Sequence, residues 1–173
     1  MVGCPDAWRS YDAVAVGSPN VGSMLSAFRA EAKRQYASIG KTVDRTEWGL
    51  NPQDVNAYYK PFSNEIVFPT AIPQPPFFDD KADPASNFGA IGDVIGHEIT
   101  HGFDVTGSQF DAKGNFGAWW TGVDKTKFDA LQKRLADQHS AIEVLPGLKL
   151  DGQIEIGENT ADLGGIQNGY AAL

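Results

Sequence analysis

Two histidines and a glutamate within residues 94–103 have the types and spacing of a metal-dependent hydrolase. His97 and His101 are four residues apart, so on a helix they lie one turn apart on the same face. Two neutral imidazoles in that arrangement can each give one nitrogen to a single zinc ion. Glu98 points to a neighbouring part of that face, where it can take a proton from an attacking water. An isolated H-E-x-x-H segment also fits a buried helix whose histidines pair with backbone or solvent.

A third metal ligand is best sought in residues 157–162, which read G-E-N-T-A-D. A catalytic zinc site needs three protein ligands and one position open to water. Glu158 lies 57 positions after His101, on a second predicted helix. Asp162 follows one turn later on the same face, which suits a carboxylate that accepts the far N–H of a zinc histidine. Acidic residues are also common at solvated helix starts, so this segment indicates a metal site only in combination with the two histidines.

Composition limits the class of protein. The chain has 173 residues, of which 42% are hydrophobic and 21% charged, enough for one domain or for two small lobes around a cleft. The net charge of −8 excludes the basic footprint of a nucleic-acid-binding protein. The single Cys4 excludes an internal disulfide framework. No apolar run approaches the roughly 18 residues of a membrane span and the first residues lack signal-peptide features, so we expect no membrane segment. The localisation stays unknown.

The first half of the chain predicts one helix and one hairpin. Apolar residues at helical spacing within 22–39 indicate an amphipathic helix whose stripe belongs to a core. Residues 55–59 and 65–68 are rich in β-formers and are separated by five residues, which predicts a hairpin with an exposed edge strand. Residues 70–78 contain three prolines and cannot be regular, so their apolar side chains are expected to form a wall against the metal helix.

The second half predicts helices joined by a loop. After the metal helix, glycines punctuate a long loop with Trp119 and Trp120 as anchors. Helical periods follow over residues 124–142 and 154–173, with a turn at 148–152 between them. Gly164 and Gly165 lie inside the last helix, where each costs roughly 1 kcal/mol against alanine, so we expect another backbone to pass very close. The predicted fold is α+β, with a small, mostly antiparallel sheet beside three or four helices.

Five segments together resemble the neprilysin family of zinc metallopeptidases, in that family's order. They are N-A-Y-Y at 56–59, N-E-I-V-F-P at 64–69, Q-P-P-F-F at 74–78, V-I-G-H-E-I-T-H-G-F-D at 94–104 and G-E-N-T-A-D at 157–162. The resemblance runs from about Val2 to the last residue and is highly specific. It implies a thermolysin-like metallopeptidase with a glutamate as third zinc ligand.

Carried over residue by residue, the resemblance implies a role for each matching position. It makes His97, His101 and Glu158 the ligands of one zinc ion per chain, and Glu98 the general base. Asp162 would orient a zinc histidine.

The resemblance also implies how a peptide or unstructured polypeptide would bind. Asn56 and the backbone of Ala57 would hold it, which also suits an edge strand, because an extended peptide can add to a sheet as an antiparallel strand. Ile72, Phe77 and Val94 match positions of an apolar pocket for the residue after the scissile bond, although core packing explains each of them equally well. Asp104, three residues after His101, is a candidate for a helix end or for a supporting carboxylate.

The chain also departs from the family pattern. Family enzymes are several times longer, with a helical domain that caps the cleft, so residues 1–173 would be a catalytic core without that cap and without the C-terminal segment. The family has a later histidine and arginine that assist the reaction, whereas the 15 residues after Glu158 contain neither.

Two functions from different classes therefore stay open. The first is a zinc endopeptidase, which we favour, and the second is a zinc-binding module with little or no turnover. Exposed apolar residues of the last helix also predict self-association, or contacts rebuilt within the chain.

Overall fold

The computed structural model describes residues 1–17 and 19–173, which divide into two compact units. The larger unit comprises Met1–Cys4 and Trp48–Leu173 and holds all of the candidate site residues. The smaller unit comprises Pro5–Glu47. None of the helices in the described residues is long and apolar enough to cross a bilayer.

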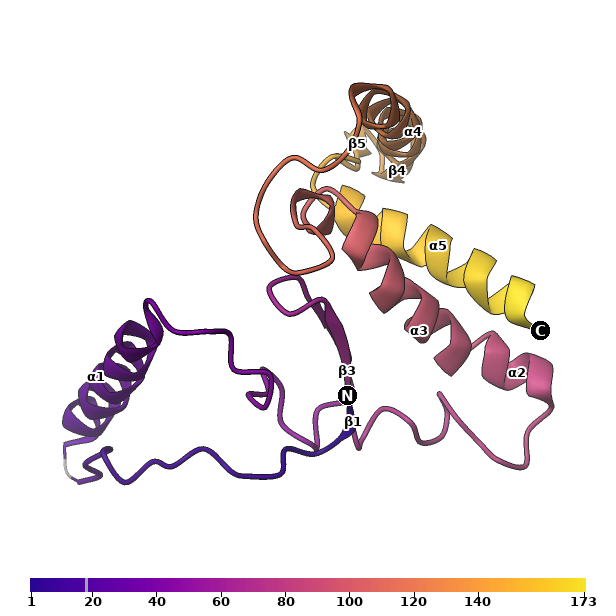
Figure 1. Ribbon diagram of the computed structural model, residues 1–173. Helices are drawn as coiled ribbons and strands as arrows, with labels where there is room; N and C mark the ends of the chain where they lie inside the picture. The colour runs from indigo at the N-terminus through magenta and orange to yellow at the C-terminus, as the bar shows by residue number, and fades with distance from the viewer. Residues whose placement is uncertain (18) are drawn as a thin grey trace. The chain divides into compact units, whose positions relative to one another are not determined.

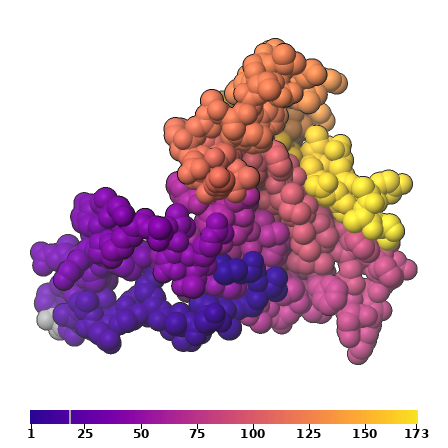
Figure 2. Space-filling model, viewed as in Figure 1, coloured from indigo at the N-terminus to yellow at the C-terminus, as the bar shows by residue number. Residues whose placement is uncertain are grey.

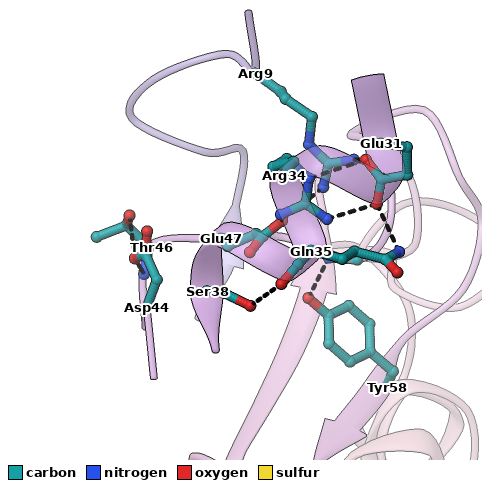
Figure 3. A network of polar contacts seen from close by, with 10 residues as sticks. Arg9, Glu31, Arg34, Gln35, Ser38, Asp44, Thr46, Glu47 and Tyr58 are labelled. Carbon is teal, nitrogen blue, oxygen red and sulfur yellow. Dashed lines mark hydrogen bonds and ion pairs between the residues drawn. The ribbon is translucent and has the colours of Figure 1, made fainter. Parts of the chain in front are cut away.

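The smaller unit is organised around one helix and one charged network. Helix α1 (Asn20–Ser38) ends before Gly40, which has a positive φ of 76°. Arg34 pairs with Glu31 at 2.6 Å and also with Glu47, and Arg9 pairs with Glu47 at 2.9 Å (Figure 3). These side chains are partly exposed, so the network joins the segments before and after α1 at a modest gain in stability.

The apolar stripe of α1 is not buried, contrary to the prediction that it forms a core. The helix has no buried residue among those described. Exposed fractions reach 66% at Phe28 and 73% at Tyr36. The predicted helix is confirmed, but a helical period alone does not say whether another element covers the stripe.

A three-stranded sheet in the larger unit has the strand order β1-β3-β2. β1 (Val2–Gly3) is parallel to β3 (Glu65–Pro69), and β2 (Tyr58–Lys60) is antiparallel to it. β2 is therefore an edge strand, as the sequence predicts. It begins later than predicted because the Ala57 N–H donates to the Asn56 side chain at 2.9 Å and leaves the strand ladder.

Two antiparallel helices carry the candidate site. α2 (Pro84–Phe88) leads into α3 (Ile91–Thr100), and the chain returns along α3 as α5 (Ile156–Ala172), as Figure 1 shows. A Cβ added at Gly165 would lie 2.6 Å from the Asp93 carbonyl oxygen, and one at Gly96 would lie 2.9 Å from the Gly165 Cα. The predicted close approach of another backbone is confirmed at Gly165, whereas the close neighbour of Gly164 is the side chain of Thr100. The approach at Gly165 brings the backbones of α3 and α5 together.

The segment between α3 and α5 contains two 3₁₀ turns, one helix and one hairpin. The turns are η1 (His101–Phe103) and η2 (Gly107–Gln109). Helix α4 (Gly122–Ser140) starts at Thr121, whose hydroxyl accepts the Asp124 N–H at 3.1 Å. β4 (Glu143–Leu145) and β5 (Leu148–Lys149) form a hairpin where the sequence predicts only a turn, because strands this short and exposed show no period.

Apolar burial is limited in this unit. Ala57, Phe68 and Ile72 form a small buried cluster, and Phe77 and Val94 pack against it. α3 is only partly enclosed, since Ile99 is 47% exposed. Figure 2 shows α5, in yellow, open along one side of the unit. Its exposed apolar residues are Leu163, Ile166, Tyr170 and Leu173.

Candidate metal centre

The two histidines lie on one face at the end of α3. His97 is in the last turn of the helix, and His101 begins η1, which continues the helical course by one turn. Their ring centroids are 4.5 Å apart and the ring planes are perpendicular. Both side chains are largely buried, with 18% and 17% exposed, so the rings are held by their surroundings.

Glu158, in the first turn of α5, faces both histidines. Its Oε2 lies 3.4 Å from His97 Nε2 and 3.6 Å from His101 Nε2. A tetrahedral zinc ion with bonds of about 2.0–2.2 Å separates its ligand atoms by roughly 3.4 Å. One ligand atom from each of the three residues lies within 4.8 Å of the others. Two imidazole nitrogens and one carboxylate oxygen are a typical donor set for catalytic zinc, so these residues fit the ion.

A carboxylate lies behind each histidine. Asp162 Oδ1 is 2.8 Å from His97 Nδ1, and Asp104 Oδ2 is 2.7 Å from His101 Nδ1. An Nδ1–H that donates to a carboxylate leaves Nε2 unprotonated and facing Glu158. The two carboxylates thus favour the tautomers that metal binding needs.

Asp104 is buried, with 5% of its surface exposed, and is held by the loop that follows α3. Its Oδ1 accepts the N–H groups of Thr106 and Gly107, each at 2.7 Å. Burial alone would raise the pKa of Asp104, but the hydrogen bonds from His101, Gly107 and Thr106 outweigh it and lower that pKa. In return, the hydrogen bond to Asp104 raises the pKa of His101.

Glu98 is the buried carboxylate beside the ligands, with 4% of its surface exposed. Burial raises its pKa, the two histidines and the Tyr59 backbone N–H oppose that rise, and Glu158 adds to it. Glu98 Oε2 has no hydrogen-bond partner among the described residues. A buried carboxylate with a raised pKa and a free oxygen is suited to accepting a proton.

A cleft of about 410 Å³ joins these residues to the edge strand. Asn56, Ala57 and Tyr59 line one side of it, and the two histidines, Glu98 and Glu158 line another. Asn56 is exposed and its Oδ1 already accepts the Ala57 N–H, so its amide nitrogen stays available to donate. The structure therefore brings the predicted peptide-binding residues beside the predicted metal ligands.

The three apolar residues of the predicted substrate pocket do not line the cleft. Ile72, Phe77 and Val94 are not among the described residues that line the cleft. They surround Ala57 in the buried cluster instead. Ile72 is nearly inaccessible at 3% exposed, whereas Phe77 and Val94 are half-buried. Their role in substrate binding stays a prediction.

Sequence reasoning underrated one residue and missed another. Asp104 was only a loose candidate, and the available signal was its position three residues after His101, within reach of the same helical face. Asp93 is the missed residue. Its Oδ1 is buried without a partner in the described part of the chain, and burial together with Asp162 raises its pKa, against the influence of His97.

This geometry belongs to a known family of metallopeptidases. Residues 56–173 match the family described as "Peptidase family M13", so the chain belongs to this family. The predicted resemblance to neprilysin-like enzymes is confirmed. The match includes every residue of the candidate metal centre.

Relatives of known sequence and structure agree with this assignment. The chain is 42% identical over 140 residues to Neprilysin-3 of Drosophila melanogaster, covering 81% of this chain and 18% of that protein. It is 42% identical over 133 residues to a neutral endopeptidase of Lactococcus lactis, covering 77% and 21%. It also resembles the inhibitor complex of the zinc metalloprotease Zmp1 of Mycobacterium tuberculosis, with a TM-score of 0.89 and 46% identity over 99% of this chain and 27% of that one. The chain thus spans about a quarter or less of these relatives.

Proposed function

We propose that this chain carries the hydrolytic centre of a zinc endopeptidase. The observation that supports this is the convergence of His97, His101 and Glu158, whose ligand atoms lie within 4.8 Å of one another, with buried Glu98 alongside. We infer that these three residues hold one zinc ion per chain. Bound zinc supplies a Lewis acid that polarises the scissile carbonyl and lowers the pKa of water towards about 7.

Glu98 acts as the general base in this proposal. Because its pKa is raised, Glu98 binds a proton more readily than an ordinary carboxylate does, which suits a general base. It takes a proton from the attacking water and passes it to the nitrogen of the leaving amine. Glu98 lines the cleft, and its buried Oε2 has no competing donor among the described residues.

Asp162 and Asp104 act through the histidines. Each accepts an Nδ1–H and holds the imidazole so that its Nε2 faces the metal position. These carboxylates are positioning residues, because the metal ligands lie between them and the reacting atoms.

The substrate is a peptide or an unstructured polypeptide that adds to the sheet alongside its edge strand β2. Because the Ala57 N–H is taken by Asn56, the polar groups offered to the peptide are the Asn56 amide nitrogen and the Ala57 carbonyl. Phe77 and Val94, half-buried behind Ala57, favour a large apolar residue after the scissile bond, and Ile72 supports them from the core.

A second function is a zinc-binding module with little or no turnover. The described residues that line the cleft include no lysine or arginine. A cationic or hydrogen-bonding group that stabilises the developing oxyanion is commonly worth about 100- to 1,000-fold in kcat. A chain that lacks such a group would keep its zinc and react slowly.

One experiment separates the two functions. Purified chain is assayed for zinc content and for cleavage of an unstructured peptide with leucine or phenylalanine at one position. Glu98→Gln serves as the inactive variant, and Asp80→Asn, at an exposed turn, is the matched control. Cleavage that Glu98→Gln abolishes and Asp80→Asn retains supports the endopeptidase. Full zinc occupancy without any cleavage supports the module, and absence of zinc contradicts both.

A further inference from the structure

We propose that an aromatic surface next to the metal cleft binds an apolar side chain of the same polypeptide substrate, at a distance from the bond that is cut. The proposal rests on the proposed peptidase function and extends it to a class of substrate. We define the aromatic surface by the apolar side chains that line it, which are Phe103, Trp119, Trp120, Phe128 and Leu131.

The rings of the aromatic surface pack against one another and line a common hollow. The ring centroids of Trp119 and Trp120 are 5.2 Å apart, and those of Trp120 and Phe128 are 5.0 Å apart. The rings stand at 56° and 46° to each other, so they form the walls of a hollow of about 390 Å³. Offset and tilted rings present both faces and edges to an apolar guest.

Three of the apolar side chains that line the hollow are open to solvent, and Phe103 is 51% exposed. Trp119 is 46% exposed and Leu131 is 60% exposed. Apolar groups gathered at one exposed place usually mark a binding surface. Thr121, Asp124 and Lys127 complete the lining and give the hollow a polar rim, which is the usual arrangement around a residue that anchors a partner.

Shared walls connect the aromatic surface to the metal cleft. Tyr59 lines the cleft and also lines a second cavity of about 370 Å³. Phe103 and Trp119 line that second cavity and also the aromatic surface. Phe103 follows the metal-binding residue His101 by two positions. Because these cavities share wall residues they lie next to one another, so a polypeptide that leaves the cleft can pass Tyr59 and the second cavity towards the two tryptophans.

The sequence of neighbouring cavities favours the substrate itself as the occupant. A separate small ligand would not need a path to the cleft, whereas an extended chain lying in the cleft continues into its surroundings at about 3.3 Å per residue. We expect a leucine- or phenylalanine-type side chain of the substrate to fill the hollow. Long substrates with such an anchor should bind better than short ones with the same scissile bond.

The test compares three peptides that share one cleavable sequence. One has about six residues, one has about fifteen with an apolar anchor near its end, and one has the same length with serine in place of that anchor. Trp119→Ala and Leu131→Ala should each lower kcat/KM for the anchored peptide by about fivefold or more. Cleavage of the other two peptides should not change. Trp8→Ala, which removes a tryptophan that is 71% exposed in the smaller unit, is the matched control.

The outcomes separate this proposal from the proposed function. Equal losses on all three peptides, or no loss on any, would overturn the aromatic surface while leaving the peptidase intact. If the chain cleaves none of the three peptides, the proposed peptidase function is refuted. Peptide binding then tests the aromatic surface on its own. The anchored peptide should then still shift the tryptophan fluorescence of the parent chain and of Trp8→Ala, but not bind Trp119→Ala or Leu131→Ala. Equal binding by all four proteins would refute the surface.

Discussion

Asp162 Oδ1 lies 2.8 Å from His97 Nδ1, although 65 positions separate the two residues. The contact joins α5 to α3 on the side of the imidazole away from Nε2, the proposed metal-binding nitrogen. Glu158, one turn earlier on α5, reaches the other side of the same imidazole at 3.4 Å. One helix thus supplies both the proposed third ligand and the carboxylate that orients the first, so the placement of α5 determines the geometry of the whole centre.

Removal of the Asp162 carboxylate should weaken zinc binding without removing a ligand. We expect Asp162→Ala to lose about 10- to 100-fold in zinc affinity, because His97 would no longer be held in one tautomer and orientation. Competition with a chelator of known affinity measures the change. Asp80→Ala, at an exposed position, should bind zinc like the parent chain, and unchanged affinity in Asp162→Ala would argue against the orienting role.

Zinc removal should destabilise the larger unit, because the ion ties α3 to α5. At a free zinc concentration about 100 times the dissociation constant, the stabilisation is roughly 2.7 kcal/mol. A chain of this size should then melt about 5–10 °C lower after chelation. Calorimetry with and without chelator measures this, and Glu158→Ala should show little difference between the two conditions. If the parent chain melts at the same temperature with and without chelator, zinc does not tie α3 to α5.

Substitution at the close backbone contact between the two helices should disturb both stability and metal binding. An alanine Cβ at Gly165 would lie 2.6 Å from the Asp93 carbonyl oxygen and 3.1 Å from the His97 N, so α5 would have to move away. Overpacking of this kind costs about 1–3 kcal/mol. Gly22→Ala, in the open on α1, is the control and should be neutral or stabilising. Thermal melting and zinc titration check both effects, and a Gly165→Ala chain that matches the parent in both would contradict the close contact.

The charged network of the smaller unit should be visible as a lowered pKa of the Glu31 carboxyl. The Arg34 hydrogen bond, followed by that of Gln35, lowers the pKa of Glu31 from 4.5 to about 2. A lowered carboxyl pKa contributes stability that is present above pH 4.5 and is lost as the pH falls towards 2. NMR titration of the Glu31 carboxyl should give a midpoint near 2, and Arg34→Gln should return it towards 4.5. An ordinary midpoint in the parent chain would show that the network does not persist in solution.

The exposed apolar face of α5 should make the chain self-associate. Leu163, Ile166 and Tyr170 follow one another at intervals of three and four residues and are 48%, 63% and 82% exposed. Burial of such side chains is worth about 1.5–3 kcal/mol each. Light scattering should show oligomers, and Ile166→Lys should shift them towards monomer. A monodisperse monomer that binds no apolar dye would rule out this face as an interface.

The grouping of the candidate metal ligands and the main elements could be predicted from the sequence because their signals are local. The H-E-x-x-H spacing fixes two groups on one helical face, and the interval between Glu158 and Asp162 fixes two more on another. Gly165 predicted the approach of a second backbone, and the structure shows it at Asp93.

Features that depend on distant neighbours could not be predicted in the same way. The stripe that includes Phe28 has a clear helical period, but its exposure depends on what lies opposite. β1 is only two residues long and is defined by its pairing with β3, which its own sequence does not show. Whether Ile72 lines a pocket or fills a core likewise depends on the packing around Ala57.

The antiparallel contact of α3 and α5 has a consequence for the order of events during folding. The two histidines are adjacent as soon as α3 forms, whereas Glu158 arrives only when a loop of more than fifty residues has closed. Such closure is entropically costly and comes late compared with local helix formation. A chain in which α5 has not docked offers zinc two nitrogens and releases it readily. The moment at which zinc becomes resistant to chelation therefore marks helix docking, and stopped-flow chelator challenge during refolding would time that step directly.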